Sequence, residues 1–136
     1  MELNIRLANV GDCIRIAAVD PFRREEQISQ AIAERQCFTA ASDSGIVGFF
    51  ILNDHFFGNS FIDLLIVRAD CRCQGIGTAL IDHAKRNRKT RKLFTSTNES
   101  NAPMQALLAK TGFRPCGQVD ALDEGDPERI YIYESE

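Results

Sequence analysis

The stretch DLLIVRADCRCQGIGTALIDHAKR, residues 63–86, passes from an apolar strand pattern into the spacing of an amphipathic helix. Its run at residues 64–67 is apolar on both parities, which is typical of a central strand covered on both faces. Apolar side chains then recur at helical spacing from residue 75 to about residue 88. Between the two patterns, residues 72–77 read Arg-Cys-Gln-Gly-Ile-Gly. A plain turn needs one glycine at most, so the second indicates that something approaches the backbone closely.

A glycine-bearing turn that opens a helix after a strand predicts an anion site. The unpaired N–H groups of the first helical turn lie at the positive end of the helix dipole, which suits a phosphate. Arg72 and Gln74 can add charge and hydrogen-bond donors beside them. The turn lacks the Gly-Lys-Ser/Thr of a P-loop and the G-x-G-x-x-G of a Rossmann fold. Tight packing of strand against helix is the alternative explanation of the two glycines.

The composition of the chain predicts one globular domain over residues 1–136. A net charge of −3 provides no overall basic field for nucleic acid or for an anionic membrane. No apolar run approaches the roughly 18 residues of a membrane span, and the first residues lack a signal-peptide pattern. We therefore expect a cytoplasmic protein with no nucleic-acid and no membrane partner, either a monomer or a homodimer.

The five cysteines, in a chain without a secretion signal, predict free thiols rather than a disulfide framework. Cys71 and Cys73 have C-x-C spacing, and both histidines, His55 and His83, lie far from them in the sequence. This arrangement does not match the ligand spacing of a zinc site. We therefore expect no bound metal.

Periodicity and turn signals predict about seven strands and about four helices. The expected strands cover residues 2–7, 37–42, 46–53, 61–67, 93–98, 113–122 and 128–134. The expected helices run from a cap at Asn9 or Asp12 through Val19, from Asp20-Pro21 to about Arg35 with Phe22 on the apolar face, from Gly75 to about Arg88, and from a cap at Asn101 to Gly112. The order β-α-α-β-β-β-α-β-α-β-β predicts an α/β (α+β mixed) fold, a central mixed sheet with flanking helices.

This combination resembles the GNAT superfamily of acyl-CoA-dependent N-acetyltransferases. The family's motif Q/R-x-x-G-x-G/A is matched by Arg72, Gly75 and Gly77, and its preceding L-x-V by residues 65–67. About 24 residues further on, NAPMQALLAKTGF at residues 101–113 resembles the family's N-x-x-A-x-x-L-Y-x-x-x-G-F. Met104 replaces the alanine of that motif and Leu108 replaces its tyrosine.

The resemblance implies an acetyl-CoA cosubstrate and an N-acetyltransferase activity. It implies that backbone groups of residues 65–67 pair with pantetheine, and that one of these amides polarises the thioester carbonyl. It further implies that the amides of residues 73–78 hold the pyrophosphate, and that Asn101 hydrogen-bonds the pantetheine arm in addition to capping its helix. The implied cofactor-binding residues are Leu65, Ile66, Val67, Arg72, Cys73, Gln74, Gly75, Ile76, Gly77, Thr78 and Asn101.

The residues for the chemical step are less well indicated. Family members often use an acid on the strand before the asparagine helix as base and the helix tyrosine as acid, and these positions are Ser96 and Leu108 here. Asp63 and Tyr133 are the catalytic candidates that we select, although an exposed strand-end carboxylate and a packed ring are ordinary explanations of them. The remaining substitutes for the base are His55, Glu99, Glu128 and Tyr131.

The acceptor is expected to be a small-molecule or peptide amine, attacking the thioester directly. Its cationic character is suggested by the acidic segment at residues 120–128, which contains Asp120, Asp123, Glu124, Asp126 and Glu128. A solvated turn is the alternative explanation of that segment. Two other classes of function remain open at this stage. One is a non-catalytic acyl-CoA-binding or sensor protein on the same fold, and the other is an interaction module without cofactor.

Overall fold

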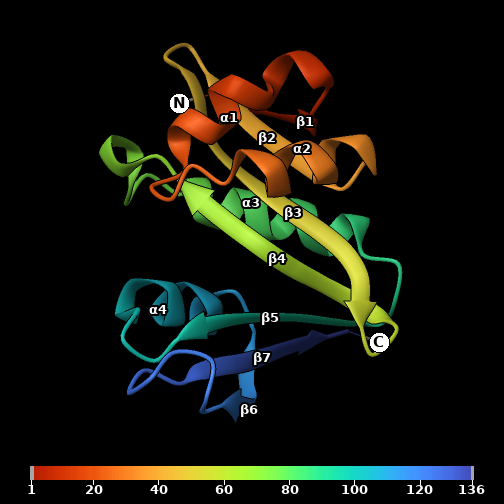
Figure 1. Cartoon of the computed structure of the whole chain (residues 1–136), viewed down its shortest axis with the longest axis vertical. Coiled ribbons are helices and arrows are strands. Elements are labelled where there is room, and N and C mark those ends of the chain that lie inside the picture. Colours follow the sequence, from red (N-terminus) through yellow and green to blue (C-terminus); the bar gives the residue numbers. More distant parts are fainter. Residues whose placement is uncertain (1, 136) are drawn as a thin grey trace. The chain divides into compact units, whose positions relative to one another are not determined.

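The computed structural model describes residues 2–135 and contains seven strands and four α-helices (Figure 1). The strands are β1 (Asn4–Leu7), β2 (Cys37–Ser42), β3 (Gly45–Phe56), β4 (Asn59–Val67), β5 (Lys92–Asn98), β6 (Arg114–Val119) and β7 (Glu128–Glu134). The helices are α1 (Cys13–Val19), α2 (Glu25–Ala33), α3 (Ile76–Asn87) and α4 (Ala102–Lys110), with short 3-10 turns η1 (Val10–Asp12) and η2 (Ala69–Cys71). The predicted mixed α/β fold and its order of elements are confirmed.

The strands hydrogen-bond in the order β1-β2-β3-β4-β5-β7-β6. Pairing between β4 and β5 is parallel and joins residues 60–62 to residues 93–95, whereas β1 with β2, β2 with β3, β5 with β7 and β6 with β7 are antiparallel. The chain separates into two compact units, which we call unit 1 (residues 2–52 and 64–86) and unit 2 (residues 53–63 and 87–135). No helix in residues 2–135 has the length and apolarity needed to cross a bilayer.

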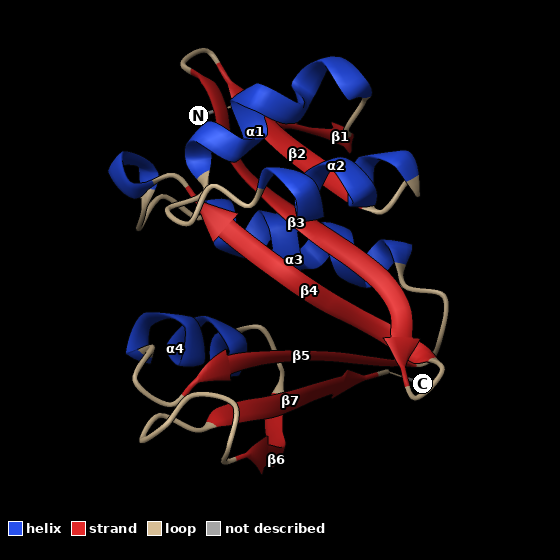
Figure 2. Ribbon diagram, viewed as in Figure 1, coloured by secondary structure: helices blue, strands red, loops and turns tan. Residues whose placement is uncertain are grey.

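Helices lie on both faces of the strands of unit 1 (Figure 2). Phe49 of β3 packs in a buried cluster with Ile28 of α2 and with residues of α1. Phe50, the next residue, stacks on Phe38 with ring centroids 4.9 Å apart, and His83 of α3 lies 5.4 Å from Phe38. Neighbouring residues of a strand point to opposite faces. Helices α1 and α2 therefore cover one face and α3 the other.

A buried carboxylate, Asp12, fixes the start of α1 in unit 1. It is 1% exposed and accepts hydrogen bonds from Arg6 (2.7 and 3.0 Å), from Arg15 (2.8 Å) and from the backbone N–H of Asn9 (2.8 Å). The hydrogen bonds from Arg6 lower the pKa of Asp12 to about 2 against the opposing effect of burial. The carboxylate is thus a charged, fully partnered structural anchor.

The start of the second helix corrects one expectation. Asp20-Pro21 does not open a helix, because α2 begins only at Glu25. The Asp20 carboxylate instead accepts from the N–H groups of Phe22 and Arg24 (both 3.0 Å) and from the Arg24 guanidinium (2.9 and 3.0 Å), which holds residues 20–24 in a turn. Phe22 is consequently 77% exposed rather than part of an apolar helix face.

Unit 2 combines β5, β7 and β6 with α4 on one face. Leu108 of α4 is fully buried, and the Tyr131 hydroxyl of β7 donates to Gln105 of α4 at 3.3 Å. The end of β3 and the first half of β4 also belong to this unit. There, Phe56 stacks on Phe61 and lies against Phe94 of β5, with centroids 5.0 and 4.9 Å away.

Candidate active site

The second half of β4 in unit 1 leads into the predicted cofactor turn. Residues 64–67 are half-buried rather than fully covered, which corrects the expectation of a strand covered on both faces. Leu64 and Ile66 pack against the α1–α2 core, so that the alternate residues Leu65 and Val67 point to the other face. The strand is therefore held by its Leu64–Ile66 face, and Leu65 and Val67 are only partly covered.

The turn at residues 72–75 presents the start of α3 as an anion site. Cys73 (φ 64°) and Gly75 (φ 81°) both adopt the left-handed conformation, which a residue with a side chain rarely does. The first intrahelical hydrogen bond runs from Ala79 N–H to Gly75 O (3.1 Å). The four N–H groups of residues 75–78 consequently have no intrahelical acceptor and lie at the positive end of the helix. Such an arrangement binds phosphate groups.

Burial around this turn shows what anchors it and what stays accessible. Ile76 is 1% exposed and fixes the first turn of α3 to the core of unit 1, whereas residues 72–75 are exposed. A β-carbon added at Gly75 would meet no heavy atom within 4 Å, so glycine is required there by its φ and leaves open space in front of the backbone. Residues present at the turn thus fit a pyrophosphate.

Arg68, which sequence reasoning missed, braces the segment between β4 and the turn. Its guanidinium donates to the carbonyl oxygens of Ser44 (3.2 Å) and Ile46 (3.1 Å), to Ser44 Oγ (3.0 Å) and to Asp70 (2.6 Å). Its backbone N–H donates to Val47 O at 2.7 Å. The hairpin turn between β2 and β3 is thereby tied to η2. An arginine directly after a strand carries no distinctive sequence signal for this role.

Asn101, the implied pantetheine contact, lies in unit 2 at the start of α4. Its side chain is exposed and its Oδ1 accepts from Met104 N–H at 3.2 Å, which confirms the predicted N-cap. Gly112 follows the helix with φ 93°, as predicted for its end. The cap uses only the side-chain oxygen, so the predicted hydrogen bond from the amide nitrogen to a cofactor stays a prediction.

Polar side chains surround the carboxyl end of β5 in unit 2. Ser96 Oγ donates to Glu128 Oε2 of β7 at 2.7 Å. Asn98 Nδ2 donates to Asp123 (2.9 Å), and Ser100 donates to Asp126 through its N–H (3.0 Å) and its hydroxyl (2.6 Å). Two of the predicted acidic residues therefore fasten the β6–β7 loop to the β5–α4 loop instead of standing free in a solvated turn.

The two selected catalytic candidates are placed at different levels of unit 2. Asp63 is exposed and follows Ile62, the last residue of β4 that pairs with β5, opposite Thr95. Tyr133 pairs with Leu93, at the other end of β5, and its ring packs against Phe113 (5.6 Å) and Arg88 (5.4 Å). The structure does not bring the two side chains into one constellation. The role of each stays a prediction.

The other candidates differ in what surrounds them. His55 is exposed near the end of β3, Tyr131 is 4% exposed and bonded to Gln105, and Glu99 lies 3.7 Å from Arg129. Leu108 is fully buried and fills the core rather than lining an open space. Residues 2–135 contain no cluster of three or more His, Cys, Asp or Glu residues that could hold a metal ion, and all five cysteines are free thiols.

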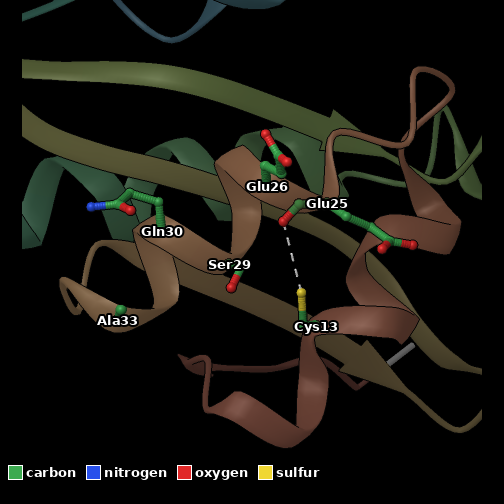
Figure 3. A pocket seen from close by; sticks show the side chains of 6 residues that line it. All are labelled: Cys13, Glu25, Glu26, Ser29, Gln30 and Ala33. Atoms are coloured by element: carbon green, nitrogen blue, oxygen red, sulfur yellow. Dashed lines mark hydrogen bonds between the residues drawn. The ribbon is translucent and has the colours of Figure 1, made fainter.

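An open pocket lies between α1 and α2 in unit 1 (Figure 3). Cys13 stands on its α1 side, with Sγ 4.0 Å from the carbonyl oxygen of Glu25. The α2 side carries polar groups and one small apolar residue. The lining residues are Cys13, Glu25, Glu26, Ser29, Gln30 and Ala33. None of the sequence-predicted site residues is among them.

Comparison with known proteins identifies the family of the chain. Residues 11–113 match the model of the acetyltransferase (GNAT) family. The peptidyl-lysine N-acetyltransferase YjaB of Salmonella typhimurium is 32% identical over 104 residues, which cover 76% of this chain and 67% of that protein. A GNAT family acetyltransferase from Bacillus cereus has 33% identity and a TM-score of 0.94, covering 100% of this chain and 99% of that one. An acetyltransferase from Bacillus anthracis in complex with acetyl coenzyme A has 17% identity and a TM-score of 0.87, with 100% of both chains covered.

Proposed function

Because the chain belongs to the GNAT acetyltransferase family, we propose that it transfers the acetyl group of acetyl-CoA to the side-chain amine of a peptide lysine. It is an N-acetyltransferase, and acetyl-CoA is its cosubstrate. The lysine acceptor is suggested by the activity of the Salmonella relative, which is named for peptidyl-lysine. Small primary amines are the competing acceptors.

The observation that carries the cofactor assignment is the turn from β4 into α3. Its left-handed residues 73 and 75 and the four free N–H groups of residues 75–78 suit the pyrophosphate of acetyl-CoA. Arg72 and Gln74, both exposed, add a charge and donors at the same turn. Leu65, Ile66 and Val67 supply the backbone groups for pantetheine, and Asn101 supplies a further donor.

The reaction is a direct attack of the amine nitrogen on the thioester carbonyl carbon. A carbon–nitrogen bond forms, the carbon–sulfur bond breaks, and coenzyme A leaves as a thiolate of modest basicity. A lysine amine has a pKa of about 10.4, so freeing it of its proton at pH 7 costs about 4–5 kcal/mol. The protein therefore needs a proton acceptor more than it needs an acid, which fits the buried aliphatic side chain at Leu108.

Thiol release from acetyl-CoA tests the proposal directly. A peptide with one lysine and a blocked N-terminus should release coenzyme A, and mass spectrometry should find one acetyl group on the lysine. The same peptide with arginine in place of lysine is the matched control. Release with spermidine or an aminoglycoside but not with the peptide would move the acceptor to small amines. Absence of release with every amine would contradict the assigned reaction.

Cofactor binding can be tested apart from turnover. Acetyl-CoA should raise the melting temperature, since it binds the folded state only. Gly77→Glu places a side chain and a negative charge at the first turn of α3, so its affinity for acetyl-CoA should fall by well over tenfold, more than about 1.4 kcal/mol. Calorimetry measures this, with Gly117→Glu on the exposed strand β6 as the control. A folded Gly77→Glu protein that binds normally would contradict the phosphate site.

A further inference from the structure

The hydrogen-bonded pair Ser96–Glu128 lies on the face of unit 2 that α4 does not cover. Ser96 on β5 is paired across the strands with Ile130 of β7, and Glu128 is two residues from Ile130 on the same face. Tyr131, on the alternate face, points to α4 and bonds Gln105 there. Both members of the pair are half-buried, and their oxygens are 2.7 Å apart. The pair is therefore ordered and remains partly open to solvent.

The position of Ser96 along β5 also favours a role for the pair in the reaction. Parallel pairing of β5 with β4 ends at Thr95 opposite Ile62, and Ser96 is the next residue of β5. Ligands of open α/β sheets bind outside the carboxyl ends of parallel strands. Ser96 thus lies toward the carboxyl end of β5, the strand that precedes Asn101.

Glu128 accepts a side-chain hydrogen bond from the neutral hydroxyl of Ser96. Asp123 and Asp126 are taken up by Asn98 and Ser100, and Glu99 faces Arg129. Within residues 2–135, no Lys, Arg or His side chain forms an ion pair with Glu128. Its cross-strand neighbours are Asn98 on β5 and Val119 on β6, neither of which titrates. The negative charge is therefore held by one hydroxyl and remains available to a cation.

We propose that Glu128 is the proton acceptor for the attacking amine and that the Ser96 hydroxyl positions its carboxylate. This inference rests on the proposed function. The ammonium form of the acceptor is drawn to the carboxylate, and its proton passes to Glu128. The freed nitrogen bonds to the acetyl carbon and gives its second proton to water, the carbon–sulfur bond breaks, and the departing thiolate takes up a proton from water. Glu128 then returns its proton to solvent.

The serine at position 96 is part of this arrangement and not a missing group. Its hydroxyl donates to Glu128 Oε2, which leaves Oε1 free of that contact. One oxygen is thus fixed by the protein and the other can accept the proton. A carboxylate reaching across from β7 takes the place that a carboxylate on β5 itself would fill.

Glu128→Gln tests the assignment, since the amide can still accept the Ser96 hydrogen bond but cannot take a proton. With the blocked lysine peptide at pH 7, we expect kcat/KM to fall by about 100-fold or more, which is the usual contribution of a general base. Acetyl-CoA affinity and the melting temperature should stay near those of the parent. The deficit should shrink as the pH is raised toward 10, because the peptide amine then loses its proton unaided.

Three further variants, made in parallel, distinguish the proposed roles of Glu128 and Ser96 from the alternatives. Glu134→Gln removes a carboxylate from the same face of the same strand at its opposite end, and should keep the parent's kcat/KM. Ser96→Ala should lower kcat by about tenfold without changing acetyl-CoA affinity, and it tests the pair even if Glu128→Gln folds poorly. Asp63→Asn removes the other carboxylate candidate and shows whether it, rather than Glu128, accepts the proton.

The outcomes separate this inference from the proposed function. If the parent acetylates the peptide and both Glu128→Gln and Ser96→Ala match it, the assignment is overturned and the reaction stands. A large, pH-dependent loss in Asp63→Asn instead assigns the base to Asp63. A Glu128→Gln deficit that is the same at every pH overturns proton transfer and leaves a structural role. If the parent acetylates no amine, the proposed function fails and the inference fails with it.

Discussion

Two sets of carboxylates, one in each unit, are held in different ways. In unit 1, buried Asp12 and Asp20 are matched by guanidinium groups, from Arg6 and Arg15 and from Arg24. In unit 2, the carboxylates of Asp123, Asp126 and Glu128 accept hydrogen bonds from neutral amide, hydroxyl and backbone groups. A buried carboxylate that is paired with guanidinium groups stabilises the fold and attracts a further cation only weakly. A carboxylate that accepts hydrogen bonds from neutral donors still attracts a cation. The first set therefore serves the fold, and the second set includes Glu128, for which we propose contact with the acceptor.

The largest effect on stability is expected at Asp12, a buried carboxylate that is paired with two arginines. Asp12→Asn should reduce the free energy of unfolding by about 2 kcal/mol at neutral pH, because Arg6 loses its charged partner. The folded-state pKa of Asp12 is about 2 and its ordinary value is 3.8. A lowered pKa contributes stability above the ordinary value that is lost as the pH falls through the folded value.

Urea unfolding of parent and Asp12→Asn at several pH values measures this effect. The two free energies should converge as the pH falls from about 4 toward 2. Activity per folded molecule should be unchanged, since Asp12 has no part in the proposed chemistry. An equal gap at all pH values would show that the carboxylate charge is not what stabilises unit 1.

The next effect concerns Leu108, where unit 2 has a core residue in place of a possible acid. Leu108 is fully buried, so Leu108→Tyr should overpack unit 2 and lower the free energy of unfolding by about 1–3 kcal/mol. Thermal unfolding measures the loss, and Leu108→Met is a control of similar volume. A raised kcat in Leu108→Tyr would contradict the view that the reaction needs no side-chain acid at position 108.

A smaller effect is expected from the loop that Asp126 fastens. Asp126→Ala removes two hydrogen bonds to Ser100 and should lower the free energy of unfolding by about 1 kcal/mol. Glu124→Ala, an exposed change in the same loop, is the matched control and should leave stability unchanged. Equal melting temperatures for the two variants would show that the hydrogen bonds of Asp126 do not stabilise the fold.

The smallest effect is expected at Glu124, whose charge would act on the acceptor only over a distance. Glu124→Gln should raise KM for the lysine peptide by less than about threefold at low ionic strength and leave kcat unchanged, because it weakens only a long-range attraction. The difference should vanish in about 0.5 M salt, where the field is screened. A salt-independent change in KM would instead point to direct contact between Glu124 and the acceptor.

The sequence predicted well those features that depend on local backbone rules. β2 and β7 occupy the predicted residues, Asn101 caps α4, and the two-glycine turn leads into α3. Apolar spacing, cap residues and glycine positions are local signals, so a single chain is enough to place them. The Asp20-Pro21 signal failed because its carboxylate could pair with Arg24 in a turn, which competes with helix capping.

The candidate catalytic groups were less predictable because they depend on register. Glu128 meets Ser96, 32 positions away in the chain, because of how β7 pairs with β5. Among the acids at residues 120–128, Glu128 differs in one local respect, since it begins a predicted strand. Alternation from that strand start could have placed it on the face opposite Tyr131. The partner across the sheet could not be read from the sequence.

The exposed thiol of Cys73 gives the cofactor turn a built-in reporter. Cys73 lies in the turn itself, whereas the second exposed thiol, Cys116, lies on β6 of the other unit. A maleimide label followed by peptide mass mapping would report the accessibility of each thiol separately. If the nucleotide binds at the turn as we propose, it should shield the first thiol. Occupancy of the turn can thus be followed by footprinting, before any acceptor is identified and without an isotope.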